Sequence, residues 1–185
     1  MLSKETFNEI QQRLVTAWHR GDLDRAFLEI ETVMREGSPE MKGQCLFFRG
    51  MIHESNGSLN QARLDWLDAL HYAEDGTFLR YELEMNIGAA SEKLSTGDDA
   101  LTWYRAALMT CVNGHEFSPH QALDAFRRLS GTEISPEDKP LLTTAVEKSW
   151  RVLELPGKPD QSDLTSSINQ VTQSFNEIIE KARQT

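Results

Sequence analysis

The stretch NGSLNQARLDWLDAL, from Asn56 to Leu70, indicates how this chain folds. An Asn-Gly turn opens onto a segment whose apolar residues recur with helical spacing. One face of that segment carries Ala62, Trp66 and Ala69, so a large aromatic side chain lies between two small ones. Small side chains let a second helix approach closely, and a large one fills the space where two helices cross. The stretch therefore predicts one helix of a tightly packed helical pair.

The same pattern occurs three times, at intervals of 36 and then 38 residues. Self-similarity at such a period is typical of stacked helix-turn-helix hairpins, in which each hairpin completes the core of its neighbour. Each copy has an aligned residue in a first helix, then a small residue, an apolar residue four positions on, and another three positions later: Leu14, Ala26, Ile30 and Val33; Gly50, Ala62, Trp66 and Ala69; Gly88, Ala100, Tyr104 and Ala107.

The rest of the chain also shows helical periodicity, interrupted by turns rich in Gly, Pro, Asn and Asp, and we expect about nine helices. Ser135 followed by Pro136 predicts the start of a helix that runs to about Glu154. The predicted organisation is a repeat region over residues 1–113, packing or capping helices over 114–154, a linker over 155–162 and an amphipathic helix over 163–185.

The C-terminal helix has two interpretations. Its apolar stripe has the spacing of a helix that buries one face. Packing against its own chain is the favoured interpretation, and self-association through this helix, or occupation of the protein's own groove, is the alternative.

The three copies resemble tetratricopeptide repeats (TPRs). GMIHESNGSLNQARLDWLDAL and GAASEKLSTGDDALTWYRAAL carry the TPR order of small and aromatic residues, and LVTAWHRGDLDRAFLEIETV carries it loosely. The resemblance covers about residues 7–113 and implies an all-α, TPR-like solenoid of about three helix-turn-helix hairpins with C-terminal capping helices. The chain departs from the pattern at Leu14, where a small residue is usual, and its period exceeds the usual repeat of about 34 residues.

The resemblance also implies a concave groove lined by the first helix of each hairpin. Such a groove would bind a protein or peptide segment with apolar anchors, and its glutamates imply basic flanks on that partner and disfavour acidic chaperone tails. Carried over position by position, the groove residues are Asn8, Gln11, Val15, Trp18 and His19 in the first copy; Gln44, Phe47, Met51, Glu54 and Ser55 in the second; and Glu82, Met85, Ala89, Glu92 and Lys93 in the third.

Charge excludes several classes of ligand. The 185 residues carry a net charge of −10, from 29 acidic and 19 basic residues. Such a chain is repelled by nucleic acid and by anionic membranes, and the basic residues form no stripe. No apolar run reaches the about 18 residues of a membrane span, and the N-terminal segment lacks the apolar core of a secretory signal, so we expect a cytoplasmic protein. Cys45 and Cys111 form no Cys-x-x-Cys motif and are expected to be buried thiols.

No motif for a metal, a nucleotide or another cofactor is present, so we expect none. His115 and His120 are interpreted as parts of a loop, and Asp98 and Asp99 as the start of a helix. The expected function is that of a non-enzymatic adaptor, scaffold or dedicated chaperone. Two alternatives stay open: an immunity or inhibitor protein that neutralises a toxin or a basic effector, and a helical enzyme whose site assembles from His53, Glu54, Glu92 and Asp99.

Overall fold

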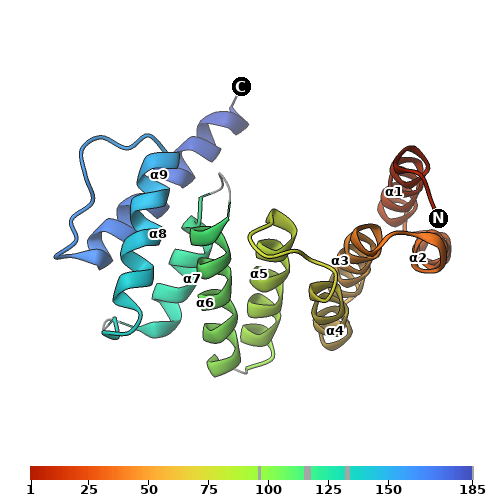
Figure 1. Cartoon of the computed structure of the whole chain (residues 1–185), viewed down its shortest axis with the longest axis horizontal. Helices are drawn as coiled ribbons and strands as arrows, with labels where there is room; N and C mark the ends of the chain where they lie inside the picture. The colour runs from red at the N-terminus through yellow and green to blue at the C-terminus, as the bar shows by residue number, and fades with distance from the viewer. Residues whose placement is uncertain (96, 115–117, 132–133, 185) are drawn as a thin grey trace. The chain divides into compact units, whose positions relative to one another are not determined.

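The computed structural model describes residues 1–95, 97–114, 118–131 and 134–184, and this part of the chain contains nine α-helices and no β-strand (Figure 1). The all-α prediction is therefore confirmed, and within each compact unit neighbouring helices in the sequence pack against one another, as in a helical repeat. The helices are α1 (Lys4–His19), α2 (Leu23–Glu36), α3 (Pro39–Ser55), α4 (Leu59–Leu70), α5 (Phe78–Lys93), α6 (Gly97–Asn113), α7 (His120–Ser130), α8 (Lys139–Val152) and α9 (Leu164–Arg183).

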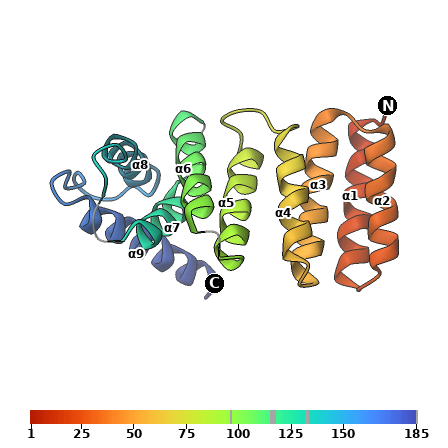
Figure 2. The same ribbon diagram turned by 90° about the horizontal axis from the view of Figure 1, so that it is seen from below.

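The chain forms two compact units, Met1–Glu74 and Asp75–Thr185. In unit 1, α1 packs against α2 and α3 against α4, and α3 also contacts α1 and α2 (Figure 2). Side chains cap the first turns of three of these helices: Ser3 accepts the N–H of Thr6, Asp22 that of Arg25, and Ser38 that of Met41. The core of unit 1 comprises Phe7, Ile10, Leu14, Ala17, Ala26, Ile30, Val33, Cys45 and Ile52.

The aligned residues of the repeat meet at the crossing of each hairpin. A methyl group at Gly50 would lie 2.6 Å from Cδ1 of Trp66, and one at Gly88 would lie 2.7 Å from Cε1 of Tyr104. In the first hairpin the same positions hold Leu14 and Ile30, and both are buried. Leu14 is larger than the glycine at its position in the other two hairpins, and Ile30 is smaller than the aromatic ring at its position. The two aliphatic side chains thus take the place of the glycine and the ring.

In unit 2, α5 packs against α6, α6 against α7 and α8, and α9 against α7 and α8. The ammonium group of Lys148, on α8, donates hydrogen bonds to the carbonyl of Cys111 and to that of Gly114, the latter at 3.0 Å. These bonds satisfy carbonyls at the end of α6. The core comprises Tyr81, Ala100, Tyr104, Ala107, Leu108, Cys111, Ala122, Leu123, Ala125, Phe126, Leu142, Ala145, Val146, Trp150, Leu164, Ile168 and Val171.

Helix α8 begins three residues later than predicted. Ser135 does accept a backbone N–H, from Asp138 at 3.1 Å, but its carbonyl accepts from Asp138 and Lys139 as well. Residues 136–138 therefore form a turn, and the α-helix begins at Lys139. Arg105 of α6 holds the Asp138 carboxylate through Nε at 2.8 Å and Nη2 at 3.0 Å, which fixes this turn against α6.

The first half of α9 packs within its own unit. Leu164, Ile168 and Val171 are buried, and the ring of Phe175 stacks on His120 with 3.4 Å between the ring centres. Ile178, one turn further on, is 45% exposed. No helix in the described residues has the length and apolar content that crossing a membrane requires. Cys45 and Cys111 are buried free thiols, and burial raises the pKa of each to about 12.

Replacing Gly50 by Ala tests the helix crossing. The substitution gains about 1 kcal/mol of helix propensity, whereas overpacking a core costs about 1–3 kcal/mol. Because the new methyl would press on the rigid Trp66 ring, we expect a net loss in the free energy of unfolding, measured by urea denaturation. In a Trp66→Leu background the same substitution should cost less. A Gly50→Ala protein at least as stable as the wild type would contradict the crossing.

His120 gives unit 2 a pH dependence. Burial lowers its pKa from 6.5 to about 4, against smaller opposing effects of the Ser118 backbone and Asp124. The folded unit therefore keeps the His120 ring neutral. The contribution of this buried neutral ring to stability is fully present above pH 6.5 and is lost as the pH falls towards 4. Changing His120 to Phe keeps a ring against Phe175 and removes the titration. Between about pH 7 and pH 5 the melting temperature, followed by circular dichroism, should fall more for the wild type than for the variant. An equal fall in both proteins would show that burial of His120 is not the cause.

Candidate functional site

Unit 1 contains a hollow of about 450 Å³ between α1 and α3, lined by Gln11, Gln12, Val15, Thr16 and Phe48. We call it the α1–α3 groove. Val15 and Phe48 are half-buried and pack on the core of the unit, so they form an apolar floor. Gln11, Gln12 and Thr16 add polar groups around that floor. The groove therefore offers both an apolar contact and hydrogen-bonding groups.

Helical spacing explains how α1 contributes to the groove. Gln11, Val15 and Trp18 are separated by four and three positions, so they lie on one face of the helix. At the end of this row, Trp18 Nε1 donates to Ser55 Oγ at 3.2 Å, and Ser55 Oγ donates to the Ile52 carbonyl at 2.8 Å. These two bonds connect α1 to the last turn of α3 and hold the two walls together.

The glutamine side chains of the groove are available to a ligand. Neither Gln11 nor Gln12 makes a side-chain hydrogen bond with any residue that the structure describes. Gln12 is exposed and Gln11 is half-buried. Each amide has two N–H donors and one carbonyl acceptor, which match the C=O and N–H groups of a peptide backbone. An extended segment in the groove could therefore bond to both amides.

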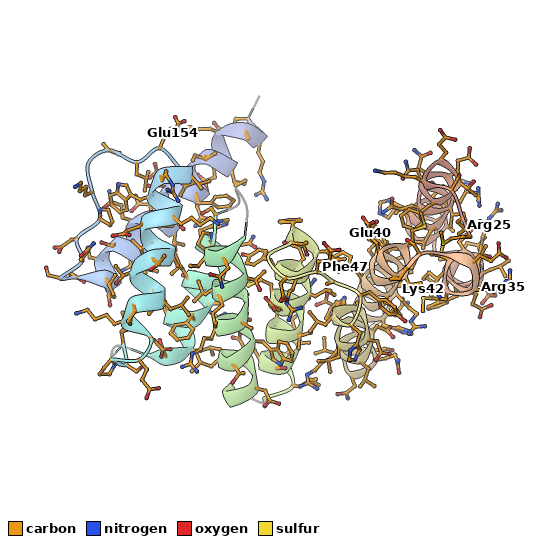
Figure 3. All side chains as sticks on the ribbon, in the orientation of Figure 1. Arg25, Arg35, Glu40, Lys42, Phe47 and Glu154 are labelled. Carbon is orange, nitrogen blue, oxygen red and sulfur yellow. The ribbon has the colours of Figure 1, made fainter. Side chains whose placement is uncertain are left out.

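Phe48 lines the groove, whereas the sequence pattern predicts its neighbour, Phe47. Phe47 is labelled in Figure 3. Its ring lies edge-on to that of Phe48, with 5.9 Å between ring centres, and its backbone carbonyl accepts the indole N–H of Trp66 at 3.2 Å. Periodicity contains a signal for this difference. Phe48 continues a row of apolar side chains that pack on the core at four- and three-residue spacing, namely Met41, Cys45, Phe48 and Ile52. The corresponding row through Phe47 holds glycines, Gly43 and Gly50.

The other predicted residues of unit 1 lie on the same two helices. Asn8 and His19 of α1 are exposed, and the imidazole of His19 lies 5.6 Å from the Trp18 ring. On α3, the side chains of three predicted residues are half-buried, namely Gln44, Met51 and Glu54.

The predicted residues of unit 2 lie on α5 and have different surroundings. Met85 packs on the core of the unit, and burial raises the pKa of Glu82. Glu92 binds the Arg128 guanidinium and accepts the Tyr104 hydroxyl at 3.0 Å, and these bonds lower its pKa. The charge of Glu92 is thus compensated within its unit. Ala89 is half-buried, and Lys93 is exposed.

His53, one of the residues considered for an enzyme site, belongs to a cluster around Asp65. Asp65 is fully buried, and its Oδ1 accepts from Arg49 Nε at 3.0 Å and Nη2 at 2.7 Å. His53 Nε2 lies 3.5 Å from the other oxygen of Asp65, so this cluster connects α3 to α4. Asp99 is exposed at the start of α6. Within the described residues, no group of three His, Cys, Asp or Glu side chains could hold a metal ion.

Comparison with known proteins adds no family to this description. No protein-family model matches the chain, and no curated protein sequence matches it.

Proposed function

We propose that this chain is a TPR-like protein that works as a non-enzymatic interaction module, that is, an adaptor, scaffold or dedicated chaperone. Its α1–α3 groove would bind an extended segment of a partner protein. The observation that carries the proposal is the combination of an apolar floor, Val15 and Phe48, with the amides of Gln11 and Gln12, which bond to no residue that the structure describes. The TPR-like character is supported by the repeated crossing of a glycine on one helix with an aromatic ring on the next, at Gly50 and Gly88.

The chemistry of the groove defines what it would accept. A side chain the size of Leu or Phe placed on the floor contributes about 1.5–3 kcal/mol, and each hydrogen bond to an amide adds about 0.5–1.5 kcal/mol. Association itself costs at least about 4 kcal/mol in lost freedom of motion. One apolar anchor and two amide contacts therefore give weak binding. A partner of useful affinity must extend beyond the groove and contact other parts of the protein.

Basic flanks on the partner remain a prediction for the surfaces around Glu54 and around Glu82. Glu92 contributes less to this prediction than its sequence position suggested, because Arg128 compensates its charge. None of the five residues that line the α1–α3 groove is acidic. The groove itself therefore selects for apolar and backbone groups and not for basic side chains.

Affinity capture from the native cell extract tests the proposal. The double variant Gln11→Ala, Gln12→Ala removes both amides, and the fold should be intact because these side chains make no bond within the described chain. We expect the wild type to retain a stoichiometric partner and the variant to lose most of it. Two lost hydrogen bonds correspond to about 1–3 kcal/mol, so the dissociation constant should rise about 5- to 150-fold in a direct measurement with the identified partner.

The matched control is Asn169→Ala, Gln170→Ala, which removes two adjacent, exposed amides from α9. This variant should retain the partner. A third variant, Phe47→Ala with Met51→Ala, alters α3 outside the lining of the groove. Loss of the partner only in this third variant would assign the interface to another face of α3. Normal capture by all three variants would contradict the groove.

A further inference from the structure

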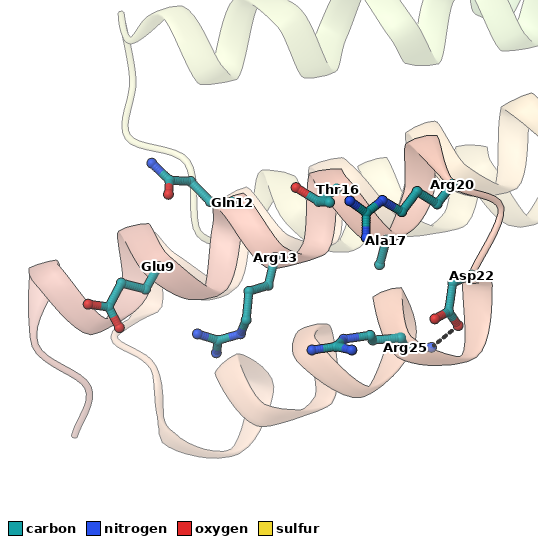
Figure 4. A pocket seen from close by; sticks show the side chains of 8 residues that line it. All are labelled: Glu9, Gln12, Arg13, Thr16, Ala17, Arg20, Asp22 and Arg25. Atoms are coloured by element: carbon teal, nitrogen blue, oxygen red, sulfur yellow. Dashed lines mark hydrogen bonds between the residues drawn. The ribbon is translucent and has the colours of Figure 1, made fainter.

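A second hollow lies beside the first in unit 1, between α1 and α2. It has a volume of about 460 Å³, and three of the six arginines of unit 1 line it: Arg13, Arg20 and Arg25 (Figure 4). We call it the arginine hollow. Arg13 and Arg25 extend into the space between the two helices, and Arg20 lies along α1. Three arginine side chains thus line one hollow of a chain whose net charge is −10.

Two of the three guanidinium groups have no direct ion pair with a described residue, although the carboxylates of Glu9 and Asp22 also line the hollow. Arg13 is fully engaged, because Nε and Nη2 bind the two carboxylate oxygens of Glu29 at 2.8 and 2.9 Å. The guanidinium groups of Arg20 and Arg25 have no ion pair or hydrogen bond with any described residue of the chain. The Oδ1 of Asp22 accepts the backbone N–H of Arg25 at 3.2 Å and caps α2 (Figure 4). The lining thus contains two carboxylates beside its three guanidinium groups.

The chemistry of a guanidinium group selects the ligand. Its planar N–H groups bind both oxygens of a carboxylate or phosphate, which a neutral side chain cannot do. Arg20 and Arg25, which have no ion pair with a described residue, are therefore each suited to a carboxylate of a ligand. The hollow also contains the exposed side chains of Gln12 and Thr16, which can bond to a neutral part of the same ligand.

The two hollows of unit 1 are continuous in their lining. Gln12 and Thr16 of α1 belong both to the arginine hollow and to the α1–α3 groove. One extended segment could therefore contact both hollows across this face of α1. We propose that the arginine hollow binds the carboxylates of an acidic stretch in the partner, directly next to the apolar anchor that occupies the groove. This inference rests on the proposed function and specifies the chemistry of its partner: apolar, with acidic residues on the side of α2.

A pair of synthetic peptides tests this inference without knowledge of the natural partner. The first probe is acetyl-Glu-Glu-Leu-Glu-Glu-amide, and the second has Gln in place of every Glu. Each is titrated into the full-length, ¹⁵N-labelled chain while the Nε–Hε signals of the arginines are followed by NMR. We expect the acidic peptide to move the signals of Arg20 and Arg25 along a saturable curve and the Gln peptide to leave them in place.

Matched charge variants show whether the response belongs to the hollow. Arg20→Gln with Arg25→Gln removes the two guanidinium groups that have no ion pair with a described residue. Arg35→Gln with Lys42→Gln removes the same charge elsewhere on unit 1, from positions labelled in Figure 3 that do not line the hollow. Since an exposed ion pair contributes a few-fold in affinity, we expect the first variant to weaken the acidic peptide about 3- to 10-fold. The second variant should bind it as the wild type does.

Three results would overturn the inference. The signals of Arg20 and Arg25 could fail to respond to the acidic peptide, or both double variants could weaken it equally, which would indicate a general charge effect. Inorganic phosphate at the same concentration could move the signals as strongly as the peptide, which would indicate a site for small anions. The capture experiment leaves every arginine in place, so these results leave the groove as proposed. Because Gln12 lines both hollows, the single variant Gln11→Ala in that experiment tests the groove alone. Conversely, failure of the capture experiment with a normal peptide response would reject the groove and keep an acidic-ligand site.

Discussion

The close approach of two helices at a glycine is the contact on which both units depend. At Gly50 and at Gly88 the first helix of a hairpin has no side chain, and the aromatic ring of the second helix occupies that space. The indole N–H of Trp66 bonds to the Phe47 carbonyl, and the Tyr104 hydroxyl bonds to Glu92, so each buried polar atom of these rings is also satisfied. Packing and hydrogen bonding thus fix the same relative position of the two helices, which is why this crossing can be repeated.

The position of α1 in unit 1 explains why two hollows lie side by side. One row of its residues, including Ile10, Leu14 and Ala17, is buried in the core, and a second row approaches α3 through Val15 and Trp18. A helix has more surface than these two rows cover, and Gln12 and Thr16 lie on the exposed remainder. This remainder borders α3 on one side and α2 on the other. The arrangement therefore creates a groove on each side without any special loop.

The sequence predicts the hairpins well because their signal is local. A glycine, an aromatic residue and two small residues at fixed spacing define a crossing that the structure reproduces at Gly50 and Trp66. The surface is predicted less completely. Phe48 rather than its neighbour lines the groove, a difference of about 100° around one helix. The arginine hollow escapes a sequence scan entirely, because Arg13, Arg20 and Arg25 belong to two helices and come together only when α1 packs on α2.

The net charge of −10 limits how the arginine hollow can act. At a distance, an acidic partner is repelled by the chain as a whole, but at physiological ionic strength charges more than about 8 Å apart are largely screened from one another. The attraction of Arg20 and Arg25 therefore operates only at contact distance, where a carboxylate can reach the guanidinium groups directly. Such a site does not accelerate the encounter of the two proteins. It instead slows the dissociation of a segment whose apolar anchor is already in place, and it discriminates among segments by the position of their acidic residues. A short acidic motif beside a large apolar side chain meets both requirements, whereas a uniformly acidic chain offers no anchor for the groove.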